Sequence, residues 1–190
     1  MQSDFQTQIQ STALFERAML AEQNFPTSTL YIVGLPIGNA ADITLRALWV
    51  LANSDVIACE DTRETKKLLD RYVITTPTLA VHEHNEREAA QKLIARLRSG
   101  ERVALVTDAG TPAVSDPGAK VVQSVRSEGF LVMPVPGACA AVTALSGAGL
   151  DAYSFTFAGF VAPNAKARDE RLRTLAGRGE AFVLYEAPHR

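Results

Sequence analysis

The chain has 190 residues, of which 47% are hydrophobic and 21% charged, and its formal net charge is −2. This length holds one domain and part of a second, and the composition is that of a globular protein. No stretch of the sequence reaches the roughly 18 apolar residues that span a bilayer, and no secretory leader opens it, so we expect a cytoplasmic protein. The slightly acidic charge gives no general attraction to nucleic acid, so RNA binding would need a local basic surface.

The predicted elements alternate regularly after a flexible arm at residues 1–28, which is rich in Gln, Ser and Thr. Short apolar runs predict strands at 30–33, 55–59, 78–81, 103–107, 131–135, 155–160 and 182–185. Helical spacing of apolar residues, with capping residues before several runs, predicts helices at 45–52, 64–71, 86–98, 116–129, 138–146 and 166–175. Strands separated by helices indicate an α/β fold, with a parallel sheet covered by helices on both faces.

The pattern changes near residue 150, and we expect two domains. Residues 29–150 would form an amino-terminal α/β domain, and residues 151–190 the beginning of a second α/β domain. Two strands and one helix cannot close a core of ordinary size. The second domain is therefore either truncated here or completed by another subunit.

Three turns rich in glycine and proline each follow a predicted strand, at residues 34–39, 108–112 and 136–138. Any one of them could be only a tight turn. Together, at the carboxyl ends of strands in one parallel sheet, they favour a shared ligand cleft. The sequence contains neither GxGxxG nor a Walker loop, so the turns are not typical phosphate-binding loops.

Polar side chains also gather where strands end. Glu60, Asp61 and Arg63 follow the second strand, His84 and Asn85 the third, and Asp108 the fourth. The simpler interpretations are a solvated ion pair, a surface histidine and helix caps, the last also for Glu86 and Asp116.

Other features support no further site. The basic segment 166–178 is either a solvated helix face or a phosphate contact. The two cysteines, Cys59 and Cys139, lack CxxC spacing and are predicted to be buried thiols, and no spacing indicates a metal site.

Several of these segments, in order, resemble the tetrapyrrole methylase superfamily. They are residues 30–39 (LYIVGLPIGN), 42–47 (DITLRA), 60–63 (EDTR), 84–86 (HNE), 108–112 (DAGTP), 115–118 (SDPG), 136–137 (PG) and 185–190 (YEAPHR). Within the superfamily they look like the branch that methylates the 2′-hydroxyl of a cytidine in 16S ribosomal RNA. The resemblance covers residues 30–190.

The resemblance implies two α/β domains, S-adenosylmethionine as the cofactor, small-subunit ribosomal RNA or the assembled 30S subunit as the partner, and a homodimer. Carried over to this sequence, the cofactor would be held by Leu35, Pro36, Ile37, Gly110, Thr111, Pro112, Val114, Ser115, Pro136, Gly137, Ala138 and Cys139. The substrate side would be formed by Glu60, Asp61, Arg63, His84, Asn85 and Asp108, with no metal. Asp108 or His84 would accept the proton of the ribose hydroxyl, and Arg63 would hold phosphate or orient a carboxylate.

The sequence departs from the family in two ways, and two alternative functions stay open beside the resemblance. The arm before residue 30 is longer than the usual start, and family members continue beyond the segment 185–190, so we expect the second domain to be incomplete. One alternative is methylation of a tetrapyrrole or another substrate of the superfamily. The other is a non-catalytic nucleotide-binding module associated with the ribosome.

Overall fold

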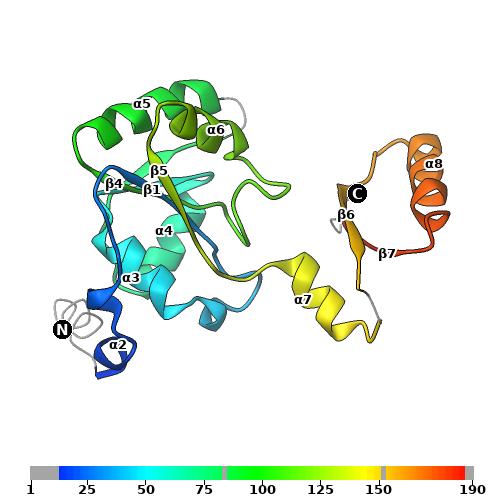
Figure 1. The fold of residues 1–190 in the computed structure, drawn as a ribbon, viewed down its shortest axis with the longest axis horizontal. Coiled ribbons are helices and arrows are strands. Elements are labelled where there is room, and N and C mark those ends of the chain that lie inside the picture. Colours follow the sequence, from blue (N-terminus) through cyan, green and yellow to red (C-terminus); the bar gives the residue numbers. More distant parts are fainter. Residues whose placement is uncertain (1–12, 83–84, 151–152, 187–190) are drawn as a thin grey trace. The chain divides into compact units, whose positions relative to one another are not determined.

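The computed structural model describes residues 13–82, 85–150 and 153–186 (Figure 1). Its internal contacts divide the chain into two compact units, residues 1–138 and 139–190. The division between the units lies about twelve residues before residue 150, where the sequence analysis placed the domain boundary. That boundary stays a prediction. No helix in the described part of the chain is long and apolar enough to cross a membrane.

The first unit is built on a five-stranded parallel sheet. Its strands are β1 (Thr29–Val33), β2 (Val56–Cys59), β3 (Thr78–Ala80), β4 (Arg102–Leu105) and β5 (Leu131–Val135). They lie in the order β3-β2-β4-β1-β5, and every neighbouring pair is parallel. The predicted parallel sheet is confirmed, and its order places β4 and β5 on either side of β1.

Helices cover both faces of this sheet, as Figure 1 shows. They are α3 (Leu45–Asn53), α4 (Thr62–Arg71), α5 (Glu86–Arg98) and α6 (Ala119–Ser127), with a short 3-10 turn η2 (Ala40–Asp42) before α3. Alternate side chains of β1 point to opposite faces, as the strand period of two requires. Tyr31 and Val33 join the core under α3 and α4, whereas Leu30 and Ile32 join the core under α5 and α6.

The segment before β1 packs on the first of these cores. It contains α2 (Ala13–Arg17) and a 3-10 turn, η1 (Leu20–Glu22). Phe15 and Leu20 are buried, and the ring of Phe25 lies 4.6 Å from the rings of both Tyr31 and Trp49. The sequence analysis placed this segment in a flexible arm because its apolar residues are sparse; each of these three has a place in the core. Residues 1–12 lie outside the described part of the chain.

The second unit contains α7 (Ala140–Gly147), β6 (Phe155–Phe160), α8 (Ala165–Ala176) and β7 (Ala181–Tyr185). Strands β6 and β7 form a two-stranded parallel sheet with a register shift between Phe157 and Gly159. Leu175 of α8 is fully buried, but Phe155 and Phe160 keep 40% and 48% of their surface exposed. Among its described residues this unit therefore has little buried core, and its assignment as the beginning of a second α/β domain stays a prediction.

Candidate active site

The turns after β1 and β5 touch through their glycines. A Cβ atom on Gly34 would lie 2.9 Å from the Cα atom of Gly137, and a Cβ on Gly137 would lie 2.6 Å from the carbonyl oxygen of Gly34. Such distances are far inside van der Waals contact, so no side chain fits at either position. The close approach follows from the sheet order, because β5 pairs directly with β1 through Val33 and Val135.

The turn after β4 is joined to the same place. The N–H group of Leu35 donates to the carbonyl oxygen of Gly110 at 2.8 Å, and the N–H group of Gly110 donates back to Leu35 at 3.1 Å. The hydroxyl of Thr111 donates to the carbonyl oxygen of Ala138 at 3.2 Å. Three turns that are distant in sequence therefore meet at the carboxyl edge of the sheet, where a parallel α/β fold binds ligands.

The turn after β4 is held in a strained shape. Gly110 and Gly118 have φ angles of +74° and +119°, and two residues with side chains, Ala113 and Ser115, have φ angles of +66° and +61°. The left-handed conformation costs an L-residue roughly 1–2 kcal/mol. One compensating hydrogen bond runs from the N–H group of Ala113 to Pro117, at 3.2 Å. Strain of this kind gathers at functional sites.

The predicted cofactor-binding residues differ in exposure. The buried members, which shape the turns from inside, are Leu35, Gly110 and Pro112. The half-buried or exposed members, which remain available to a ligand, are Pro36, Ile37, Thr111, Val114, Ser115, Pro136, Gly137 and Ala138. Cys139 is half-buried and is the first residue of the second unit.

A group of carboxylates lies beside these turns, at the ends of β2 and β4. The N–H group of Asp61 donates to Oδ1 of Asp108 at 3.1 Å, which joins the two strand ends. Burial, with the charges of Asp108 and Asp116 next, raises the pKa of Glu60. Burial and then Asp108 also raise the pKa of Asp116. The sequence analysis interpreted Asp116 as a helix cap, but in the structure its charge also helps to raise the pKa of Glu60.

Asp61 and Arg63 form the ion pair that the simpler interpretation allowed. Asp61 caps α4 by accepting from the N–H group of Arg63 at 2.8 Å, and it also binds Nε and Nη2 of the guanidinium at 3.2 and 2.8 Å. These bonds lower the pKa of Asp61 to about 2. Asp61 is therefore a fixed anion and a poor proton acceptor at neutral pH, because a general base works best with a pKa near the working pH.

The backbone after β3 is held by the side chain of Asn85. Oδ1 of Asn85 accepts from the N–H group of His82 at 2.8 Å, and its Nδ2 donates to Ala80 at 3.1 Å. The amide of Asn85 therefore stabilises the turn itself. His84 lies outside the described residues, so its role stays a prediction. Glu86, which follows Asn85, is buried, and the sequence analysis interpreted it as a helix cap.

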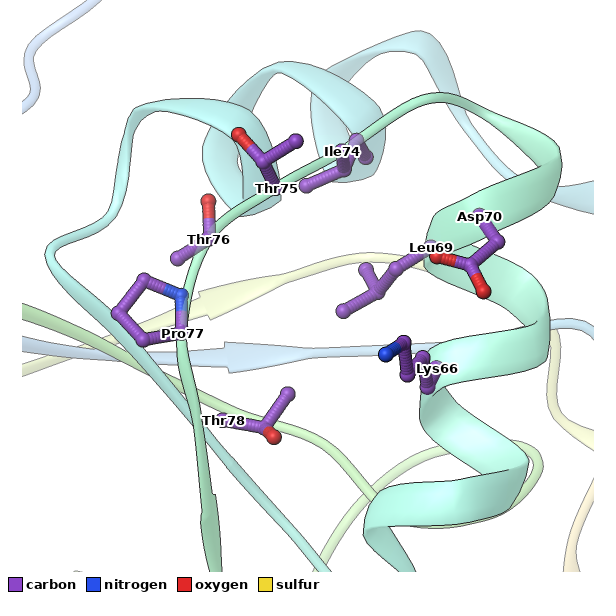
Figure 2. Close-up of a pocket in the computed structure, with 8 residues that line it drawn as sticks. All are labelled: Lys66, Leu69, Asp70, Ile74, Thr75, Thr76, Pro77 and Thr78. Carbon is purple, nitrogen blue, oxygen red and sulfur yellow. The ribbon is translucent and has the colours of Figure 1, made fainter.

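A separate pocket of about 360 Å³ lies between α4 and the segment before β3 (Figure 2). It is lined by Lys66, Leu69, Asp70, Ile74, Thr75, Thr76, Pro77 and Thr78. This pocket opens at the amino end of β3, whereas the converging turns follow the carboxyl ends of their strands. It is therefore not part of the candidate site. The described residues contain no group of three or more His, Cys, Asp and Glu that could hold a metal ion.

Comparison with known proteins gives a family match. The family described as Tetrapyrrole (Corrin/Porphyrin) Methylases matches residues 29–190. The protein called Ribosomal RNA small subunit methyltransferase I is 52% identical over 161 residues in Vibrio cholerae, which is 85% of this chain and 56% of that protein. The protein of the same name in Escherichia coli O157:H7 is 47% identical, with the same coverage. The chain thus spans somewhat more than half the length of these relatives.

Solved structures agree on the fold. Uroporphyrin-III-C-methyltransferase from Thermus thermophilus is 29% identical with a TM-score of 0.56, covering 72% of this chain and 61% of that one. A structure of diphthine synthase has a TM-score of 0.68 at 18% identity, covering 85% of this chain and 65% of that one. The second likeness concerns the fold alone.

The contact between Gly34 and Gly137 predicts that Gly137→Ala is destabilising. The new methyl group would force the turns after β1 and β5 apart, at a cost of about 1–3 kcal/mol in the free energy of unfolding. Gly147→Ala is the matched control, because nothing lies within 4 Å of its Cβ position and its backbone is helical. Urea unfolding measures both. Equal stability of the two variants would show that the turns are not in contact.

The raised pKa of Glu60 predicts a pH-dependent gain of stability in Glu60→Gln. The folded state binds the Glu60 proton more tightly than the unfolded state, whose pKa is 4.5, so the parent loses stability as the pH rises above that value. In thermal unfolding, Glu60→Gln should gain stability relative to the parent between about pH 4 and about pH 7. Glu88→Gln should show the opposite sign, because Lys92 lowers the pKa of Glu88. A Glu60→Gln variant that instead loses stability over this range would contradict the account.

Proposed function

The chain belongs to the tetrapyrrole methylase family, and on this premise we propose that it transfers the methyl group of S-adenosylmethionine to the 2′-hydroxyl of a cytidine in 16S ribosomal RNA. The observation that carries the proposal is the meeting of three turns beside a cluster of carboxylates, in a chain whose relatives are called Ribosomal RNA small subunit methyltransferase I.

The residues present fit this cofactor. Pro36, Ile37 and Val114 offer apolar surface at the turns, as an adenosyl group requires. The absence of side chains at Gly34 and Gly137 allows the backbones of two of these turns to come together. Glu60 and Asp108 create a negative field beside the turns, which attracts a positively charged sulfonium.

The protein's main task in this reaction is alignment. Bound S-adenosylmethionine supplies an activated methyl group, which needs no metal for its transfer. The turns after β1, β4 and β5 would hold it in one orientation relative to the ribose oxygen. Asp108, oriented by the N–H group of Asp61, would accept the proton that leaves the 2′-hydroxyl. Arg63, whose side chain is 86% exposed, contacts an RNA phosphate near its partner Asp61.

The proposal extends to the partners. Small-subunit ribosomal RNA, or the assembled 30S subunit, is the substrate, and the active form is a cytoplasmic homodimer. Helix α8 presents Lys166, Arg171 and Arg173 to solvent, which supports a phosphate contact, although Asp169 and Glu170 lie on the same helix.

A labelling experiment separates this proposal from its alternatives. The chain is incubated with S-adenosylmethionine carrying a labelled methyl group and either 30S subunits, free 16S RNA or a precorrin. The proposal expects label in the RNA, at a ribose that resists alkaline cleavage. Label in the precorrin would support a tetrapyrrole methylase instead. Binding to 30S subunits without label in any substrate would support the non-catalytic module.

Substitution of Asp108 tests the proton acceptor. Asp108→Asn keeps an oxygen for the bond from Asp61 but removes the base, so kcat should fall by roughly 100-fold or more. Asp70→Asn, at the pocket on the opposite edge of the sheet, is the matched control and should retain the parent rate. If Asp108→Asn retains the parent kcat and His84→Ala loses it, His84 is the base.

A further inference from the structure

A buried carboxylate ties the start of one helix to the start of another. Glu86 is the first residue of α5, and its side chain is only 7% exposed. Its Oε1 accepts a hydrogen bond from the N–H group of Gly118 at 2.6 Å, and its Oε2 lies 3.2 Å from Nζ of Lys120. Both oxygens are thus used at the beginning of α6, 32 residues further along the chain.

The environment explains why a carboxylate is stable there. Glu86 stands in the first turn of α5 and faces the first turn of α6, so the positive ends of two helices favour its charge. Gly118 is itself buried against Leu105, whose Cδ2 would lie 3.1 Å from a Cβ at this position. The N–H group of Gly118 has little access to water, so it depends on Glu86 for its hydrogen bond.

This bond closes the strained turn after β4. The turn is fixed at Gly110 by the two bonds to Leu35 and at Gly118 by Glu86. Ala113 and Ser115, with their left-handed backbones, lie between these two points. A strained segment keeps its shape only while its ends are held, so the loss of one end allows the turn to relax.

We propose that Glu86 is a positioning residue, which holds the turn 110–118 in the shape that binds the cofactor. This inference rests on the proposed function, because the turn carries the predicted contacts Thr111, Val114 and Ser115. Glu86 also directly follows Asn85, whose side chain binds the backbone of His82 and Ala80 after β3. One side chain therefore joins the segment after β3 to the segment after β4.

Of the two contacts that Glu86 makes, the hydrogen bond to Gly118 matters more than the ion pair with Lys120. The side chain of Lys120 is 59% exposed, and an ion pair so open to water contributes little. The hydrogen bond to Gly118 is buried, and an unpaired N–H group left there is costly. Glu86→Gln, which keeps an acceptor oxygen, should therefore behave like the parent, whereas Glu86→Ala should not.

The test combines two measurements on the 190-residue chain, both well below its melting temperature. Calorimetry gives the Kd for S-adenosylhomocysteine, and NMR gives the exchange rate of the Gly118 amide without ligand. For Glu86→Ala we expect a Kd and an exchange rate each increased by about tenfold or more. Glu86→Gln and Lys120→Ala should stay within about threefold of the parent. Glu88→Ala is the matched control, because Glu88 is an exposed carboxylate in the same turn of α5.

A general structural role for Glu86 would lower the melting temperature without changing the affinity of the folded protein. The proposal is overturned if folded Glu86→Ala keeps the parent Kd, whatever its exchange rate at Gly118. Should Glu86→Ala not fold, Glu86→Asp replaces it, because its carboxylate is one methylene too short to reach Gly118. A parent chain that binds no S-adenosylhomocysteine would contradict the proposed function, and the exchange rates would still decide whether Glu86 holds the turn.

Discussion

The contact between the turns after β1 and β5, joined by the backbone bonds between Leu35 and Gly110, is the constraint on which the candidate site depends. It exists because β4 and β5 both pair with β1 in parallel register, so that their carboxyl ends arrive at one edge. Gly34 and Gly137 then allow a backbone approach that any side chain would prevent. The three turns form one surface only while this contact persists.

The turn after β4 is the element that the two halves of the site share. β4 lies between β1 and β2 in the sheet, so its turn meets the glycine turns on one side and the carboxylates after β2 on the other. Asp108 faces the charged half through its bond with Asp61, and Gly110, two residues later, faces the neutral half through its bonds with Leu35. Cofactor and substrate would therefore be brought together by a single strained segment.

The sequence predicted the order and type of the strands and helices, because apolar periodicity is local and this sheet is covered on both faces. It also placed the three turns on one edge of the sheet, since the carboxyl ends of parallel strands all lie at the same edge. The roles of Glu86 and Asp116 were missed. From the sequence each is an acidic residue near a helix start, and only the fold brings Glu86 to Gly118 or Asp116 within reach of Glu60. Phe15, Leu20 and Phe25 were missed for a different reason, because three apolar residues at irregular intervals show neither a helix period nor a strand period. The individual cofactor contacts and the catalytic residues stay predictions.

The most direct measurement of the central claim is an NMR titration of the labelled chain with S-adenosylhomocysteine, which follows every backbone amide. The account predicts that the largest shifts fall together, with one common affinity, on the turns at residues 34–38, 110–115 and 136–138. Shifts centred on residues 66–78, around the pocket at the opposite edge of the sheet, with those three turns unchanged, would contradict it.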